Sequence, residues 1–394
     1  MLKSFISVRA DDNNPKWGNM IKREKSIYKR RKDLRTEFER DYARVIHCTA
    51  YRRLKHKTQV FYSPENDHIC TRIEHVTHVE SISYTIAKYL GLNQELTRAI
   101  AIAHDIGHSP FGHEGEKILN SLSMRDIGDK FWHEKNGLEM VDKIELLEDN
   151  MKNRQNLNLT YAVRDGIISH CGEIDENCLK PREEFIDLNE YQYPNQFSPY
   201  TWEGCIVKIA DKISYLGRDI EDAICVGILD ENLLNLYESL NLDPNKDVVN
   251  NTVIINDLIN DICENSSIDK GLCFSDKMFE MANRIKKFNY DNIYLDDRIK
   301  PSKEYFKIVL NQIYEILKLS FSNFEKVYKM YPKVIGEFRI WLQEYWNRER
   351  KEKNKNDVVF DVKNEKEYYK AIIYYISGMT DNYAIETYNN IIGF

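Results

Sequence analysis

The sequence lacks three features that mark common classes of protein. Its eight cysteines form no C-x-x-C pair, which argues against a zinc knuckle and favours reduced thiols in or near a core. No run of 18 apolar residues occurs, so we expect no transmembrane helix. A secretory signal contains a continuous apolar segment followed by a cleavage pattern. The first fifteen residues show neither feature. We therefore expect a cytoplasmic protein without membrane association.

An excess of positive charge is also missing. The formal net charge is −7 over 394 residues, whereas a general nucleic-acid binder usually presents a basic field. The exception is residues 1–34, an arm with little apolar periodicity. Its basic residues are Lys22, Arg23, Lys25, Lys29, Arg30, Arg31 and Lys32. A solvated arm is the simplest interpretation, and a contact for an anion or a neighbouring subunit is the alternative.

Apolar residues at helical spacing are abundant. They recur at every third or fourth position in two long stretches, Val76–Tyr89 and Ile206–Ile224, which predicts helices there. Alternating strand patterns are few, and Thr58–Tyr62 comes nearest to one. We therefore expect an all-α fold. After the arm, the sequence divides into a core at residues 35–230 and a helical C-terminal region at 231–394.

The pair His104-Asp105 closes the apolar stretch Ile100–Ala103 and is soon followed by Gly107. Neighbouring side chains on a helix point about 100° apart. The two residues can therefore grip one ion most easily from a helix end that faces a cavity. Taken alone, such a pair is more often a hydrogen-bonded polar pair at a helix end.

Further ligands could come from two other predicted helices. One begins near Arg72 and carries His75 and His78, and the other carries Asp211 directly after an apolar segment. A lone Asp is more often a surface carboxylate. Burying a carboxylate among apolar neighbours is costly, however, and a cation would offset that cost. Together with His104, these residues predict a divalent metal site built from three helical segments.

The order of these residues resembles the signature of the HD superfamily of metal-dependent phosphohydrolases. The chain is more narrowly similar to the bacterial dGTPase family, the deoxynucleoside triphosphate triphosphohydrolases, and to the vertebrate SAM-and-HD-domain dNTPase. The segments that carry the resemblance are Arg40–Val60, Arg72–Val79, His104–Glu116, Arg164–His170, Glu203–Asp222 and Gly378–Asp381. The resemblance implies an HD-domain helical fold with additional C-terminal helices.

The resemblance implies that one divalent ion is bound by His75, His104, Asp105 and Asp211, with His78 a neighbour only. A ligand set of imidazoles and carboxylates suits manganese, iron or zinc, and magnesium less naturally. The sequence therefore does not identify the ion. The implied reaction hydrolyses a deoxynucleoside triphosphate, dGTP or several dNTPs, to deoxynucleoside and triphosphate. It requires an activated water, stabilised phosphate charge and a proton for the leaving 5′-oxygen.

Further residues receive catalytic roles from the resemblance. His113 is implied as the general acid or base, with Glu116 as its orienting carboxylate; the two share a face if a helix begins near Gly112. His108 and His133 are implied to contact phosphate or a catalytic water. Taken alone, His113 and His133 fit ordinary backbone-bonded or packed histidines about equally well.

Substrate-binding residues are implied in the same way. Arg72 and Lys212 stand near metal ligands in the sequence, while Tyr215 and Asp219 follow Asp211 at +4 and +8. Taken alone, polar residues at this spacing more often form a half-exposed face of a helix. The resemblance implies that Lys212 and Tyr215 contact phosphate and that Asp219 contacts the sugar or Tyr215. It also implies that Gln59 binds the 3′-hydroxyl.

Two other functions stay open at this point. The first is an HD phosphohydrolase that acts on nucleoside monophosphates or a signalling nucleotide. The second is a nucleotide sensor or nucleic-acid-binding module, against which the complete ligand set argues. A P-loop is excluded because no G-x-x-x-x-G-K-[ST] motif occurs. Related enzymes are commonly homo-oligomers, often hexamers, and a nucleotide effector or single-stranded DNA is a further partner to consider.

Overall fold

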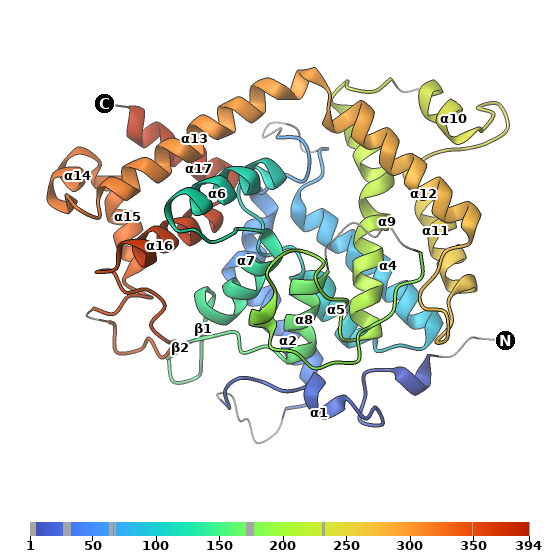
Figure 1. Ribbon diagram of the computed structural model, residues 1–394, viewed down its shortest axis with the longest axis horizontal. Helices are drawn as coiled ribbons and strands as arrows, with labels where there is room; N and C mark the ends of the chain where they lie inside the picture. The colour runs from blue at the N-terminus through green and yellow to red at the C-terminus, as the bar shows by residue number, and fades with distance from the viewer. Residues whose placement is uncertain are drawn as a thin grey trace. The chain divides into compact units, whose positions relative to one another are not determined.

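A computed structural model describes residues 5–26, 33–62, 66, 68–170, 177–230, 233–348 and 350–393. Within these residues it contains 17 α-helices and one two-stranded antiparallel sheet (Figure 1), which confirms the all-α expectation. None of the helices described is long and apolar enough to cross a bilayer.

The chain forms two compact units, each assembled from three separate stretches. The first unit comprises Met1–Tyr42, Glu65–His104 and Thr160–Lys300. The second unit comprises Ala43–Pro64, Asp105–Leu159 and Pro301–Phe394. The units therefore alternate along the chain. The sequence division into an arm, a core and a C-terminal region stays a prediction.

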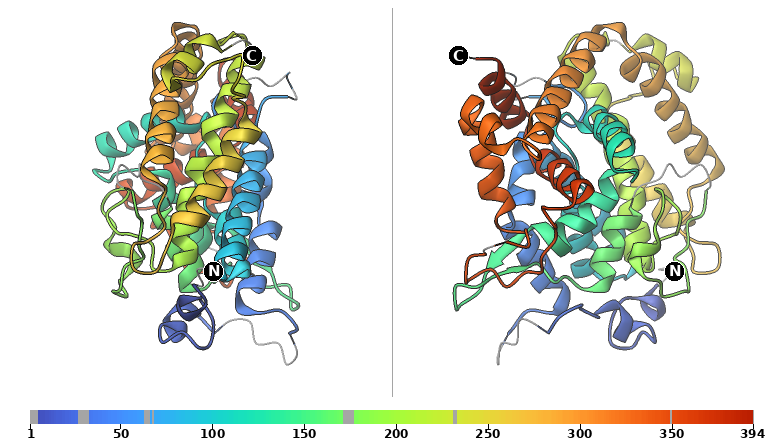
Figure 2. Two further views of the ribbon diagram at one scale, coloured as in Figure 1. Left: turned by 90° about the vertical axis from the view of Figure 1, so that its right-hand side faces the viewer. Right: turned by 60° about the vertical axis from the view of Figure 1, so that its left-hand side comes forward.

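The first unit is centred on α4 (Arg72–Leu90) and α9 (Trp202–Cys225), which lie side by side (Figures 1 and 2). Both pack against α5 (Gln94–Ala103), and α8 (Tyr161–Ser169) packs on α5 and α9. The remaining α-helices of this unit are α1 (Trp17–Met20), α10 (Leu234–Leu240), α11 (Asn251–Asn265) and α12 (Asp276–Asn289). The two helices that apolar periodicity predicts most strongly are thus confirmed as α4 and α9.

Local signals in the sequence set the ends of the site-bearing helices. At the start of α4, the Glu74 carboxylate accepts a hydrogen bond from the Thr71 backbone N–H at 2.8 Å, which forms a capping box with the Thr71 side chain. The helix ends at Gly91, whose φ of 81° is left-handed and therefore favours glycine. At the start of α5, the Asn93 side chain accepts from two backbone N–H groups.

The second unit has its own apolar core, to which Leu119, Phe306, Ile313, Phe338 and Ile372 belong. In it, α16 packs against α6 and α15, while α15 also packs against α14 and α17. Its α-helices are α3 (Thr49–Arg53), α6 (Gly112–Asp126), α7 (His133–Glu139), α13 (Lys300–Leu319), α14 (Phe324–Met330), α15 (Pro332–Leu342), α16 (Glu365–Ser377) and α17 (Asp381–Ile392); α2 (Glu37–His47) and α13 each begin in the first unit.

Short elements complete the fold. The strands β1 (Leu146–Glu148) and β2 (Arg154–Asn156) pair in the second unit, away from the segment that the sequence marked as most strand-like. The 3₁₀ turns are Ile6–Val8, Leu54–His56, Leu188–Glu190 and Asp297–Ile299, and the π turns are Met140–Ile144 and Tyr290–Tyr294.

The N-terminal arm is more ordered than its composition suggests. The Ala10 backbone N–H donates to the buried Glu203 carboxylate at 3.0 Å, and the Arg23 guanidinium pairs with Asp41 at 2.6 Å. The expectation of a solvated basic arm is therefore wrong at Arg23. Lys29, Arg30, Arg31 and Lys32 lie outside the described residues.

The expectation of reduced thiols throughout is wrong at two positions. Cys178 and Cys273, which are 95 residues apart, form a disulfide. The backbones of Leu179 and Leu272 bring them together by exchanging N–H···O bonds of 3.0 and 2.9 Å. No spacing rule in the sequence connects such distant cysteines. Among the other cysteines that the structure describes, all five are free thiols.

Candidate functional site

Two imidazoles and one carboxylate meet in the first unit, and we call this group the metal cluster. His75 comes from α4, His104 ends α5 and Asp211 comes from α9. One nitrogen or oxygen atom of each residue lies within 4.8 Å of those of the other two. His75 Nε2 is 2.9 Å and His104 Nε2 is 3.9 Å from Asp211 Oδ1. Both histidines are buried.

The outer nitrogen of each imidazole in the metal cluster is held by a neutral oxygen. His104 Nδ1 donates to the carbonyl of Ala101 at 2.6 Å. His75 Nδ1 lies 3.2 Å from the Ser214 hydroxyl, which itself donates to the backbone carbonyl of Asp211 at 2.8 Å and so accepts from His75. A hydrogen bond of this kind leaves Nε2 with its lone pair directed at a ligand.

The electrostatics of the metal cluster favour a cation. Burial opposes ionisation of Asp211, but the hydrogen bond from His75 and the nearby imidazoles His104 and His170 lower its pKa to about 2. Without a proton on His75 Nε2, however, that nitrogen and the Asp211 carboxylate would be two electron-pair donors only 2.9 Å apart, because Nδ1 carries the other hydrogen and donates to Ser214. A proton or a shared cation relieves that repulsion. The donor set therefore fits a divalent ion with nitrogen and oxygen ligands.

Asp105 follows His104 directly in the chain and opens the middle stretch of the second unit. Its buried carboxylate lies 2.9 Å from His108 Nε2. Asp105 thus contacts a histidine that the sequence assigned to catalysis. Its role as a fourth metal ligand stays a prediction.

Three histidines and a glutamate gather in the second unit, and we call them the proton cluster. They are His108, His113, Glu116 and His133. The His108 and His133 rings stack with centroids 3.8 Å apart, and the His113 ring centroid lies 5.3 Å from that of His108. His113 is exposed, whereas His108 and His133 are buried.

Carboxylates surround the buried imidazoles of the proton cluster. His133 Nδ1 lies 2.8 Å from Glu116 Oε2 and 3.3 Å from Glu134 Oε2. Glu116 was expected to orient His113, and in the structure it contacts His133; the contact with His113 stays a prediction. Carboxylate partners stabilise imidazolium, so this cluster suits proton transfer and the binding of anionic oxygens.

A buried carboxylate organises the segment around Gln59 in the second unit. Asp381 Oδ2 accepts from the Thr58 backbone N–H at 2.8 Å, and Asp381 Oδ1 accepts from the Phe111 backbone N–H at 2.9 Å. Lys57 Nζ donates to the carbonyls of His108 and Ser377. Asp381 therefore ties the Gln59 segment to the loop that carries the proton cluster.

Gln59 itself offers an acceptor. Its side-chain oxygen is buried, and no donor among the residues that the structure describes bonds to it. A buried amide oxygen in this condition is costly. A ligand hydroxyl would relieve the cost, in agreement with the expected contact to a sugar.

The predicted phosphate and sugar residues of the first unit fall on two helices. Arg72 begins α4 and is almost fully buried, and Lys212, Tyr215 and Asp219 follow one another along α9. Lys212 Nζ lies 3.5 Å from Asn283 Oδ1. The structure thus places these four side chains in the same unit as the metal cluster, whereas Gln59 belongs to the second unit.

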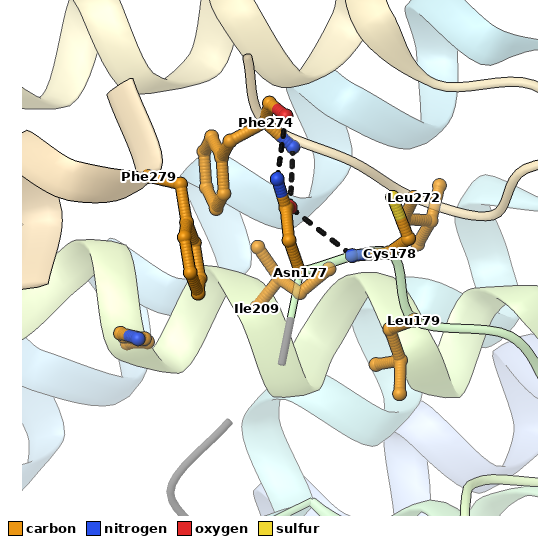
Figure 3. Close-up of a pocket in the computed structure, with 8 residues that line it drawn as sticks. Asn177, Cys178, Leu179, Ile209, Leu272, Phe274 and Phe279 are labelled. Atoms are coloured by element: carbon orange, nitrogen blue, oxygen red, sulfur yellow. Dashed lines mark hydrogen bonds between the residues drawn. The ribbon is translucent and has the colours of Figure 1, made fainter. Parts of the chain in front are cut away.

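Lys212 also lines a hollow of about 270 Å³ that is open to solvent. Its walls include Ile209 of α9, Phe279 of α12 and the disulfide-linked segments (Figure 3). The Asn177 side chain pairs with the Phe274 backbone through N–H···O bonds of 2.7 and 3.0 Å, drawn in Figure 3. Apart from Lys212 and Asn177, the side chains that line the hollow are apolar.

Sequence reasoning missed three residues that contact these side chains. The hydroxyl of Tyr294, in a π turn, donates a short hydrogen bond to Asp219. Burial raises the pKa of Asp219 to about 7, against the effect of that bond. His170 packs edge-on against His104 with ring centroids 4.9 Å apart, and the Ser214 hydroxyl is hydrogen-bonded to His75. His170 and Ser214 stand in segments that carry the resemblance and could have been found there, whereas Tyr294 carries no sequence signal.

Comparisons with known proteins agree with this geometry. Residues 72–216 match the family model of the HD domain. Over most of its length the chain is similar to proteins described as deoxyguanosinetriphosphate triphosphohydrolase-like. One from Caldanaerobacter subterraneus subsp. tengcongensis is 34% identical over 364 residues, 91% of this chain and 86% of the relative. One from Clostridium tetani is 31% identical over 370 residues, 91% of this chain and 86% of the relative. One from Pelagibacter ubique is 33% identical over 399 aligned positions, 93% of this chain and 95% of the relative.

Proposed function

Because the chain belongs to the HD-domain superfamily and, within it, to the deoxyguanosinetriphosphate triphosphohydrolase-like family, we propose that it hydrolyses deoxynucleoside triphosphates. The substrate is dGTP or several dNTPs, and the products are the deoxynucleoside and triphosphate. The observation that carries the proposal is the metal cluster, in which two imidazole nitrogens and a carboxylate oxygen lie within 4.8 Å of one another.

A divalent ion would be held by His75, His104 and Asp211, with Asp105 as the proposed fourth ligand. Manganese, magnesium, iron and zinc all stay open. When bound, such an ion activates water and neutralises charge on phosphate oxygens. The hydrogen bonds of Ala101 and Ser214 to the two Nδ1 atoms support this assignment, because they fix both imidazoles in the ligating orientation.

The proton cluster is proposed to transfer the proton of the reaction and to bind the phosphate groups. His113, the exposed histidine of the cluster, gives a proton to the leaving 5′-oxygen. His133, which is hydrogen-bonded to Glu116 and lies near the Glu134 carboxylate, and His108, which contacts Asp105, bind phosphate oxygens or hold the attacking water. Along the chain, His104 of the metal cluster is followed directly by Asp105, which contacts His108 of the proton cluster.

Substrate recognition follows from the remaining side chains. Arg72 and Lys212 are proposed to bind phosphate oxygens. Tyr215 is proposed to contact phosphate as well, and Asp219 to contact the sugar or Tyr215; the hydrogen bond from Tyr294 to Asp219 supports a fixed position of that carboxylate. Gln59 receives the 3′-hydroxyl on its buried side-chain oxygen. A homo-oligomeric state and a nucleotide or single-stranded DNA effector belong to the same proposal.

The test is product identification. Purified, manganese-loaded protein is incubated with each dNTP, each ribonucleotide and each deoxynucleoside monophosphate, and the products are separated by ion-exchange chromatography. We expect triphosphate and deoxynucleoside in equal amounts from at least one dNTP. Orthophosphate from a monophosphate, with no triphosphate from any dNTP, would instead support the other HD phosphohydrolase activity.

A further inference from the structure

A second hollow lies wholly within the second unit, beside residues that the proposed function does not use. It spans about 360 Å³ including its open mouth. Segment 127–136, which leads into α7, forms one side and α16 forms another. Its polar lining includes Lys130, Lys135 and Lys370, with Asp129 as the one carboxylate among the residues that line it.

The lysines of this hollow are only loosely neutralised. Lys135 Nζ lies 3.4 Å from Asp129 Oδ1, and Lys370 Nζ lies 4.0 Å from Asp129 Oδ2. One carboxylate is thus shared by two ammonium groups at long distances, and Lys130 adds a third positive charge. Three ammoniums and one carboxylate leave a formal charge of +2 on the lining.

Trp132 supplies a directional donor to the same place. Its side chain lines the hollow and is 4% exposed. Its indole Nε1–H is buried and meets no acceptor within the described part of the chain. Such a buried N–H is unfavourable unless a ligand accepts from it. The Lys135 ammonium lies 4.9 Å from the centre of the Trp132 ring, so cation and donor belong to one site.

The chemistry of these groups favours a phosphate-type anion. Ammonium groups act as point charges that suit a tetrahedral oxyanion, whereas a planar carboxylate is matched better by a guanidinium fork. The lining charge of +2 matches a dianion. The aromatic walls from Phe131 and Tyr374 leave room for an organic group attached to the phosphate.

We propose that this hollow binds a small phosphate-type anion. The ammoniums of Lys135 and Lys370 supply the counter-charges, and the Trp132 indole donates to a phosphate oxygen. The site is connected to the proton cluster, because Trp132 directly precedes His133 and the Asn136 side chain, which also lines the hollow, donates to the Gly107 carbonyl at 2.6 Å.

The experiment records indole N–H signals of the ¹⁵N-tryptophan-labelled full chain during titration with orthophosphate at constant ionic strength. EDTA is present throughout, so that no divalent ion at the metal cluster captures phosphate. The chain has five tryptophans, and the signal lost in Trp132→Phe identifies Trp132. We expect a saturable shift of that signal with phosphate and none with chloride. Equilibrium dialysis with radiolabelled phosphate measures the affinity independently.

Two variants on the same helix sharpen the test. Lys370→Ala should weaken phosphate binding about tenfold, the effect of losing one charge-assisted hydrogen bond. Lys366→Ala removes the same charge from an exposed position of α16 and should bind phosphate like the unaltered chain. An unshifted Trp132 signal, or equal affinities for both variants, would overturn the proposal.

The source of the phosphate is distinguished by parallel titrations. A deoxynucleoside monophosphate that binds more tightly than orthophosphate identifies a phosphorylated organic ligand that uses the aromatic walls. Orthophosphate that binds as tightly identifies the inorganic anion. An unphosphorylated deoxynucleoside that shifts the Trp132 signal equally well would refute a phosphate site.

Discussion

The metal cluster and the proton cluster use the same side chain for different tasks. In the metal cluster, the outer nitrogens of His75 and His104 bond neutral oxygens of Ser214 and Ala101. In the proton cluster, the Nδ1 atom of His133 is instead hydrogen-bonded to the Glu116 carboxylate and lies 3.3 Å from the Glu134 carboxylate. A neutral partner leaves an imidazole free to ligate a metal, whereas a carboxylate partner favours imidazolium. The hydrogen-bond partner of each histidine therefore indicates whether it ligates a metal or carries a proton, which the residue type alone does not.

The largest expected effect separates a ligand from its neighbour on α4. His75→Ala should lower turnover of dNTPs by about 10³-fold or more, because a metal supplies several kcal/mol of charge stabilisation. His78→Ala, three residues further on the same helix, should leave manganese binding and turnover near the original values. Both are measured by metal analysis after dialysis and by triphosphate release. Equal losses in the two variants would contradict the ligand assignment.

A second variant probes the proton cluster. His113→Ala should lower kcat by about 10²- to 10⁴-fold, the usual contribution of a general acid, without loss of bound manganese. The exposed Lys117 of the same helix provides the control Lys117→Ala, which should change neither quantity. If His113→Ala released the metal, the division between the clusters would be wrong.

A third variant tests the neutral partner of His75. Ser214→Ala removes the hydroxyl that accepts from His75 Nδ1, and loss of such an outer partner typically weakens metal affinity by about 10- to 100-fold. The measurement is competition for manganese against a calibrated chelator. Glu134→Gln, which alters an outer partner in the proton cluster, is the matched control and should leave the manganese affinity unchanged. An unchanged affinity in Ser214→Ala would remove the distinction between neutral and charged partners.

The last prediction concerns stability and pH, and not activity or metal binding. Burial raises the pKa of Asp219 to about 7, against about 3.9 in an unfolded chain. The folded state therefore keeps a proton between these values that the unfolded chain has lost. The stabilisation from Asp219 is complete below about pH 4 and declines as pH rises to about 7.

In Asp219→Asn this part of the decline should disappear. Tyr294, Asp222, His75 and Arg72 act on the same carboxylate and are left in place. Urea denaturation of both proteins at a series of pH values measures the slope. The exposed Asp297 provides Asp297→Asn, which should keep the original slope. An unchanged slope in Asp219→Asn would mean that the carboxyl is ionised in the folded protein.

The sequence predicted the parts of the fold that repeat locally. Apolar spacing predicts α4 and α9, and Gly91 marks a helix end because it adopts a positive φ. The positions of His75, His104 and Asp211 followed from their order and from the resemblance. What stayed hidden depends on contacts between distant residues. Tyr294 reaches Asp219 from a π turn, and Cys178 meets Cys273 only after folding.

Asp381 illustrates the limit of a motif. The sequence singled out the Gly378–Asp381 segment without a role for it. In the structure this carboxylate accepts from backbone groups of Thr58 and Phe111, which are far away in the chain. The motif indicates that Asp381 is important, but only its contacts in the folded protein show that it positions other segments of the chain.

The most direct test is anomalous X-ray scattering from crystals grown with manganese. The account predicts one manganese peak within coordination distance of His75 Nε2, His104 Nε2 and an Asp211 carboxylate oxygen, with Ser214 and Ala101 still bonded to the outer nitrogens. A manganese peak elsewhere, with His75 still hydrogen-bonded to Asp211, would contradict it.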